Sequence, residues 1–283
     1  HPKQWKIVLE FLKSKIKLPK TFSATDLALF PETKNGDIQL IIDLLMNLTA
    51  PAYYLDKNLF ALIVLKTVTI SKTHGNVSAS AHAYATYGVL LGSVFNNYTL
   101  GHKFGLLSIN LNKRFNDKKM ASKLNFIFGA LLNHWTQPAK TSLPYFIAGY
   151  TYGIECGDYT YAGNSALSYL IFQLYLGIPI PDIVTTYDTY SSFLKRVKDE
   201  HVIWRTKLVQ DYCSILVGNL TIFDHSFYIE KLKPLQGQVA WAQYLLFNMQ
   251  INFLFGKYAK AVTSGNDAYK LKDALLGQIY RID

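Results

Sequence analysis

The feature that most constrains this chain is an internal repeat of about 82 residues. Positions related by that shift carry similar residues, and the register holds over a long stretch. The aligned pairs are Gly75 and Gly157, Asn76 and Asp158, Tyr87 and Tyr169, Val94 and Leu176, Lys113 and Lys195, Arg114 and Arg196, and Asp117 and Asp199. Eighty-two residues hold about four helices, so a hairpin of two helices takes about 41. That period is typical of two-helix solenoid repeats, in which stacked units share one continuous core.

Apolar residues follow helical spacing almost throughout, and the alternation typical of strands is missing. Residues 77–95 carry two neighbouring apolar stripes, which predict a helix buried on most sides. Turn residues such as Gly75-Asn76 and Gly157-Asp158 separate the helical runs, and short turns indicate antiparallel neighbours. We therefore predict an all-α fold, namely a right-handed superhelix of αα-hairpins of the solenoid type with about 41 residues per hairpin.

The domain organisation expected from the sequence is a connector over residues 1–36 and a helical-repeat domain over residues 37–283. The first segment is rich in lysine and is interrupted by proline, so no secretory signal is expected there. Two apolar runs, 159–181 and 238–255, contain several Asn and Gln residues, which favours buried helices over membrane spans. The two cysteines suit a reducing compartment, so we expect a fragment of a larger cytoplasmic protein.

The motifs of the common enzyme classes are missing from the sequence. It has no phosphate-binding Gly-rich loop, dinucleotide fingerprint, nucleophile elbow or His-Glu-x-x-His pair. The histidines have no metal-ligand spacing, and Cys156 lacks a base that the sequence could place beside it. We expect no catalytic residue, no cofactor and no metal. The net charge of +10 raises the alternative of nucleic acid, but the basic residues gather near predicted helix ends, where they face solvent.

Aromatic residues are abundant, with 20 Tyr and 17 Phe. Most are expected to pack between helices, and the remainder to line a concave groove, because Tyr and Trp are good anchors for a partner. The candidate groove residues are Tyr84, Tyr87, Asn133, His134, Trp135 and Tyr150.

The order of these features resembles the helical-repeat region of very large bacterial signalling proteins, which join a serine/threonine kinase-like domain, a predicted ATPase, a GAF domain and a histidine kinase. The residues that carry the resemblance are 51–54 (PAYY), 58–66 (NLFALIVLK), 74–76 (HGN), Ala83-Tyr84, Tyr87-Gly88, 114–116 (RFN), 133–135 (NHW), Gly157-Asp158 and Tyr161-Ala162. That family region is similar to tetratricopeptide repeats, as are residues 97–101 (NYTLG) and 157–162 (GDYTYA) of this chain, although the unit here is longer. The resemblance therefore implies a tetratricopeptide-like solenoid, and it implies that residues 1–36 are the trailing end of a preceding module. It supplies no catalytic residue, since the kinase and ATPase motifs of that family belong to other domains.

The leading functional hypothesis is a non-catalytic interaction and regulatory scaffold that binds a protein partner or other modules of its parent chain. Extended concave surfaces are what helical repeats provide. Two alternatives stay open, namely a small-molecule sensor with an aromatic pocket and a basic RNA-binding repeat.

Overall fold

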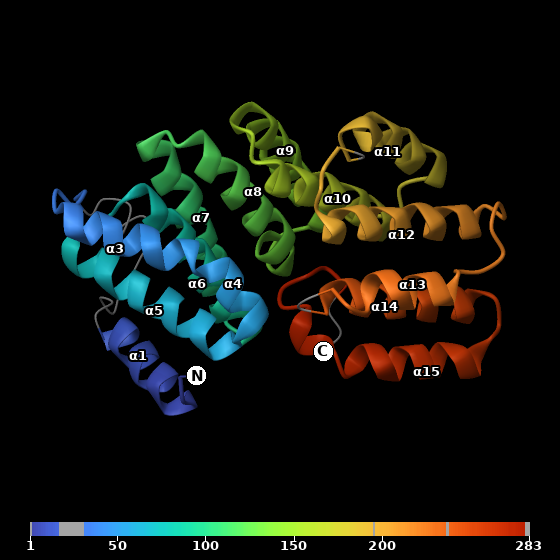
Figure 1. Cartoon of the computed structure of the whole chain (residues 1–283), viewed down its shortest axis with the longest axis horizontal. Helices are drawn as coiled ribbons and strands as arrows, with labels where there is room; N and C mark the ends of the chain where they lie inside the picture. The colour runs from blue at the N-terminus through green and yellow to red at the C-terminus, as the bar shows by residue number, and fades with distance from the viewer. Residues whose placement is uncertain (1, 17–30, 195, 236–237, 281–283) are drawn as a thin grey trace. The chain divides into compact units, whose positions relative to one another are not determined.

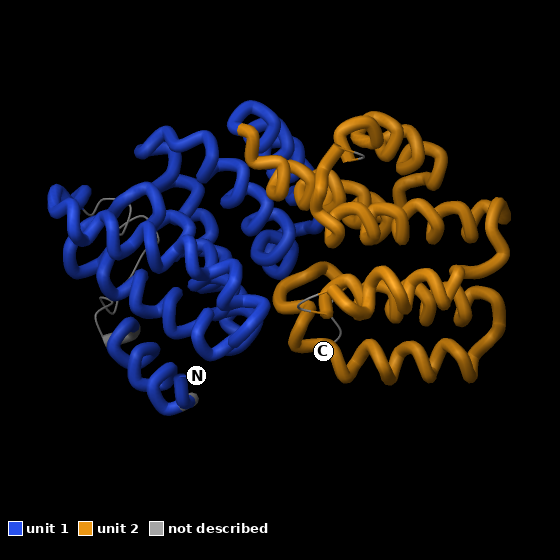
Figure 2. Tube along the Cα trace, in the orientation of Figure 1, with its two compact units in different colours: residues 1–156 blue, residues 157–283 orange. Residues whose placement is uncertain are grey.

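The structure is a computed structural model that describes residues 2–16, 31–194, 196–235 and 238–280. These residues form α-helices and short 3-10 helices and contain no strand, which confirms the all-α prediction (Figure 1). The chain forms two compact units, residues 1–156 and residues 157–283 (Figure 2). The superhelical, tetratricopeptide-like arrangement of the hairpins stays a prediction.

The elements of each unit are as follows. Unit 1 contains α1 (Gln4–Ile16), α3 (Gly36–Asn47), α4 (Thr49–Leu55), α5 (Lys57–His74), α6 (Ser78–Ser93), α7 (Tyr98–Phe115), α8 (Lys118–Leu131), η1 (Asn133–Trp135), η2 (Ala139–Ser142) and α9 (Leu143–Cys156). Unit 2 contains α10 (Tyr159–Tyr175), α11 (Ile180–Leu194), α12 (Glu200–Leu216), α13 (His225–Leu232), α14 (Val239–Leu254), α15 (Tyr258–Tyr269) and η3 (Lys272–Ala274).

The repeat of 82 residues is visible in where the helices begin. Helices α3, α8 and α12 start 82 residues apart, each directly after a side chain that accepts backbone N–H groups of the first turn: Asn35, Asp117 and Asp199. The starts of α3, α6, α8, α10, α12 and α14 are 39 to 42 residues apart, so the hairpin period is also present. Below, positions 82 residues apart are called equivalent.

Helix α6 lies at the centre of the core of unit 1. Every residue from Ala79 to Gly92 is buried, which confirms the prediction made from its two apolar stripes. It crosses α7 closely, because a Cβ atom built on Gly88 would lie 2.6 Å from the carbonyl oxygen of Gly101, and one on Gly101 would lie 2.6 Å from that of Gly88. Only glycine permits this approach of the two backbones. The equivalent positions in α10 and α11 are Leu170 and Ile183.

Helix α1 belongs to unit 1, where it packs against α5. The Lys72 ammonium donates to the carbonyl oxygen of Ser14 at 3.0 Å, and the Phe11 and Phe95 rings stack at 4.0 Å. The expected boundary between residues 36 and 37 therefore falls inside this unit. Whether residues 1–36 come from a preceding module stays a prediction, and residues 17–30 of that segment lie outside the described part of the chain.

The two runs interpreted as buried helices form α10 and α14, and both are largely buried within unit 2. A different helical stretch, Gly36–Leu55, is long and apolar enough to cross a membrane by length and composition, and 22% of its apolar 18-residue window is buried. One such helix is weak evidence, because core helices meet the same criterion.

Candidate functional site

Two residues of the expected groove lie in the core of unit 1. Tyr84 is 0% exposed and Tyr87 is 1% exposed. The Tyr84 hydroxyl donates to Asn76 Oδ1 at 2.8 Å, and the Tyr87 ring packs edge-on against Phe104 at 4.7 Å. Burial raises the pKa of both phenols. The groove hypothesis needs correction at these two positions, because side chains without exposed surface cannot contact a partner.

Three other groove residues share η1, beside α7. Asn133 is buried, and its Nδ2 donates to Thr141 Oγ1 at 2.7 Å and to Ser142 Oγ at 3.1 Å. The Trp135 ring stacks on Tyr98 with centroids 4.8 Å apart, and the His134 ring is partly buried beside it. Tyr150 lies half-buried on α9. Asn133, His134 and Trp135 thus pack together against neighbouring side chains of unit 1, and their role in binding a partner stays a prediction.

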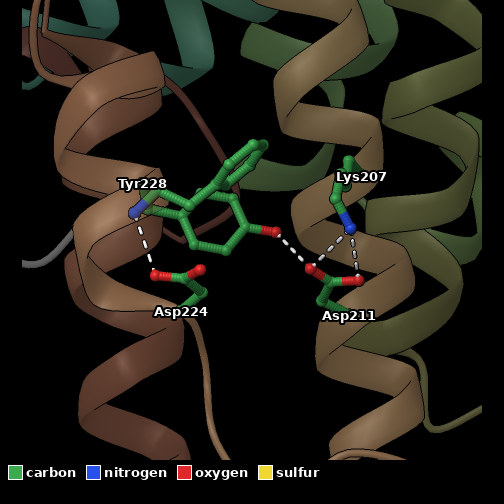
Figure 3. Close-up of polar contacts among 5 residues, drawn as sticks. Lys207, Asp211, Asp224 and Tyr228 are labelled. Atoms are coloured by element: carbon green, nitrogen blue, oxygen red, sulfur yellow. Dashed lines mark hydrogen bonds and ion pairs between the residues drawn. The ribbon is translucent and has the colours of Figure 1, made fainter.

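A second cluster, which the sequence analysis did not single out, joins α12 to α13 in unit 2 (Figure 3). The Tyr228 hydroxyl donates to Asp211 Oδ2 at 2.7 Å, and the Lys207 ammonium lies 2.9 Å from both oxygens of the same carboxylate. Tyr228 is completely buried, and the Asp211 side chain is 15% exposed. Asp224 caps α13 by accepting the backbone N–H of Phe227 at 3.0 Å. The cluster therefore fixes α13 against α12 with charge-assisted hydrogen bonds.

Stacked rings continue this cluster into α14. The ring centroids of Tyr228 and Tyr244 are 5.1 Å apart, and those of Tyr244 and Trp241 are 5.0 Å apart. The Tyr244 hydroxyl lies 2.6 Å from His225 Nδ1. Burial raises the pKa of Tyr244 to about 12, and burial together with Asp211 raises that of Tyr228 further. Both phenols are neutral near pH 7, so they donate or share hydrogen bonds and are not bases.

The outer side of the cluster presents a surface of partly exposed aromatic and cationic side chains. The Trp204 and Phe227 rings meet edge-on at 5.6 Å, Lys207 lies over Phe227 at 5.8 Å, and Lys231 lies over Trp204 at 5.6 Å. These four residues are called the α12–α13 face. Trp, Tyr and Arg anchors held by buried polar contacts are typical of interaction hot spots. The two tryptophans of unit 2 were the sequence signal that could have indicated this region.

Metal binding and nucleophilic catalysis would each need a particular arrangement of side chains among the residues that the structure describes. Within them, no three His, Cys, Asp or Glu side chains are grouped so that they could hold a metal ion. The Cys213 thiol is 3% exposed, and burial raises its pKa to about 11, so it is not an activated nucleophile.

Hollows are present among the described residues of unit 2. A wide, open one of about 910 Å³ lies at the starts of α10 and α12, where the side chains of Asp158 and Asp199 are already engaged as helix caps. A smaller one of about 150 Å³ lies between α10, α11 and α12, with Leu170, Ile183 and Cys213 in its buried floor.

The comparisons with known proteins place the chain in a signalling context. No known family profile matches it. A hybrid signal transduction histidine kinase G from Dictyostelium discoideum is 22% identical over 154 residues, which are 53% of this chain and 4% of that protein. This weak similarity fits a signalling-related role. The chain spans only a small part of that relative, so the activity of the whole relative does not transfer. The tetratricopeptide-like repeat, the bacterial source and the cytoplasmic location stay predictions.

Proposed function

We propose that this chain is a non-catalytic interaction segment of a larger signalling protein, and that the α12–α13 face binds a protein partner or another module of the parent chain. The observation that carries the proposal is the partly exposed pair Trp204 and Phe227, held in place from below by the buried bond between Tyr228 and Asp211. An anchor that is already rigid loses little side-chain entropy on binding.

The charge of the face indicates the chemistry of the partner. Lys207 and Lys231 border the rings, and each lies within 3 Å of a carboxylate oxygen, of Asp211 and Glu230 respectively. Their charges are therefore partly compensated, which favours a mixed apolar and polar protein surface over a run of phosphates. RNA binding and small-molecule sensing remain the alternative hypotheses.

The test compares the four tryptophans, which are Trp5, Trp135, Trp204 and Trp241. Immobilised chain, wild type or carrying one Trp→Ala change, is mixed with cell extract and with the kinase and ATPase modules of the parent protein at physiological salt. We expect Trp204→Ala to reduce retention of one specific protein or module about tenfold or more. Trp5→Ala, in which a 58% exposed tryptophan of unit 1 is removed, is the matched control and retains the partner.

Other outcomes distinguish the alternatives. If Trp135→Ala is the variant that loses the partner and Trp204→Ala retains it, the binding site lies at Asn133, His134 and Trp135. Retention of nucleic acid alone, released by high salt, would favour the RNA hypothesis. Equal retention by all four variants would contradict the proposal.

A further inference from the structure

The small hollow of unit 2 is a cavity of about 150 Å³. Its floor is apolar and buried, because Leu170, Ile183, Val209 and Cys213 are each no more than 3% exposed. A neutral thiol adds to the apolar character of this floor, since burial raises the pKa of Cys213 to about 11. An apolar floor in a cavity of this size accommodates a molecule about as large as benzene.

The equivalent place in unit 1 is filled. There Phe128 and Leu132 press on Gly105: a Cβ atom built on this glycine would lie 2.5 Å from Phe128 Cδ2 and 2.8 Å from Leu132 Cδ1. In unit 2 the residues equivalent to these two large side chains are Gln210 and Ser214, and both line the cavity. Two apolar side chains that close the space in one copy are therefore replaced by polar ones in the other, while Gly105 itself is replaced by Tyr187 at the edge of the cavity.

A third large side chain is also lost at the mouth of the cavity. Trp135, which stacks on Tyr98 in unit 1, is equivalent to Val217, which lines the cavity and is 50% exposed. The remaining opening is bordered by Tyr187, and burial raises the pKa of its phenol. The cavity thus lies where side chains differ between two copies whose helices begin at nearly equivalent positions along the chain.

The difference in side chains between the two units also places a charge beside the cavity of unit 2. Leu106 on α7 is equivalent to Asp188 on α11, and Asp188 borders the cavity. Its carboxylate has no ion pair within the described ranges 2–16, 31–194, 196–235 and 238–280. Helix α11, Ile180–Leu194, carries two aspartates and no basic residue in a chain of net charge +10. A ligand with an apolar body and a cationic end matches the apolar floor of the cavity and the carboxylate at its mouth.

We propose that this cavity binds a small organic amine, with an apolar body against Leu170, Ile183 and Cys213 and an ammonium group facing Asp188. The site is separate from the α12–α13 face and does not depend on it. Occupancy would hold α10, α11 and α12 at a fixed spacing, which gives unit 2 a way to respond to a metabolite.

The probes are three molecules of similar size that differ in charge: benzylamine, benzyl alcohol and benzoate. The whole chain, labelled with ¹⁵N, is titrated and the backbone amide shifts of Ile183, Val209 and Cys213 are followed. We expect benzylamine to bind with a dissociation constant of about 1 mM, as suits eight non-hydrogen atoms. Benzyl alcohol should bind more weakly, and benzoate should not bind.

Two variants separate the cavity from the charge. Ser214→Leu restores the side chain of the equivalent Leu132 at a half-buried position, and it should abolish the shifts with every probe. Asp188→Asn keeps the cavity and removes the charge, and it should weaken benzylamine about fivefold while leaving benzyl alcohol unchanged. Val262→Leu, at a 62% exposed position of α15, is the control for a substitution that leaves the cavity intact.

The outcomes are decisive in either direction. If benzylamine at about tenfold the expected dissociation constant shifts none of these amides, the cavity is not a ligand site. Equal binding of benzylamine and benzoate would contradict the amine proposal. Trp204→Ala should leave the titration unchanged, so failure of the proposed function and failure of this proposal can be told apart.

Discussion

Three helices of unit 1 begin at nearly the same spacing along the chain as three helices of unit 2, but the side chains between them pack differently. The two sets are α6, α7 and α8, and α10, α11 and α12. In unit 1, Gly88 and Gly101 let two backbones cross closely. In unit 2, Leu170 and Ile183 occupy those positions, and space between the helices remains as a cavity. The period of a helical repeat therefore fixes where helices begin, whereas the side chains at each crossing decide how closely the helices approach one another.

The same comparison explains the buried charge of unit 2. Asp211 is equivalent to Gly129, and Tyr228 is equivalent to Phe146. In unit 1 the Phe146 ring packs on the glycine, 2.8 Å from where its Cβ atom would be. In unit 2 the same contact has become a hydrogen bond between a phenol and a carboxylate, 2.7 Å long. At these two positions unit 1 has ring packing and unit 2 has a polar bond, while elsewhere α8 and α9 of unit 1 are also joined by the bond from Ser122 Oγ to the carbonyl oxygen of Gly149 at 2.8 Å.

The largest expected effect comes from Gly101→Ile, which gives unit 1 the side chain found at the equivalent position of unit 2. The new Cβ atom would lie 2.6 Å from a backbone oxygen that cannot move without shifting α6. We expect a loss of about 3 kcal/mol or more in the free energy of unfolding, measured by urea denaturation. Gly36→Ala is the control, because nothing lies within 4 Å of that Cβ position. A loss below about 1 kcal/mol would show that the close crossing is not limited by the backbones.

The next effect concerns His82, which lies in the buried helix α6 and is equivalent to Asn164 in α10. Burial, assisted by the charge of Lys123, lowers its pKa from 6.5 to about 3. Between these values the unfolded chain binds a proton that the folded chain does not, so stability is lost as the pH falls below 6.5. One such histidine contributes up to about 1.4 kcal/mol per pH unit.

The measurement is urea denaturation between pH 7 and pH 4 for the wild type and for His82→Asn. The free energy of unfolding of the variant should fall less steeply with decreasing pH than that of the wild type, by the amount expected for the uptake of one proton. His102 also has a pKa lowered by burial, so part of the acid sensitivity of unit 1 should remain in the variant. Identical slopes for the two proteins would mean that His82 is accessible to protons in the folded state.

A smaller effect is expected for Tyr228→Phe, which makes the α12–α13 contact resemble that of Phe146 in unit 1. The variant leaves the Asp211 carboxylate paired with Lys207 but removes the bond from the buried phenol. A hydrogen bond to a charged group contributes about 1.5–3 kcal/mol, and we expect a loss near the lower value because Lys207 remains. Tyr258→Phe, at a 62% exposed position, should be neutral. A neutral Tyr228→Phe would show that packing alone holds α13.

The outline of the fold could be predicted from the sequence because capping and turn residues are local signals. Asp117 and Asp199 mark helix starts wherever the rest of the chain lies. The groove was harder to predict, since a helix with two apolar stripes buries its tyrosines on every side, as Tyr84 and Tyr87 show. The bond between Asp211 and Tyr228 joins different helices, and no spacing rule brings those two residues together. The cavity depends on differences in side-chain volume, which become visible only when equivalent positions are compared.

The smallest effect is on the reactivity of a cysteine and not on the free energy of unfolding, and it tests the floor of the cavity directly. Cys156 is partly exposed in unit 1, whereas Cys213 is 3% exposed and has a pKa raised to about 11. At pH 8 only about one in a thousand Cys213 thiols is ionised, and the thiolate is the form that reacts. Iodoacetamide should therefore modify Cys156 within the time in which Cys213 stays unmodified, as peptide mass spectrometry would measure. Rapid modification of Cys213 would mean that α10, α11 and α12 separate widely in solution. The two units would then differ in mobility as well as in side-chain packing.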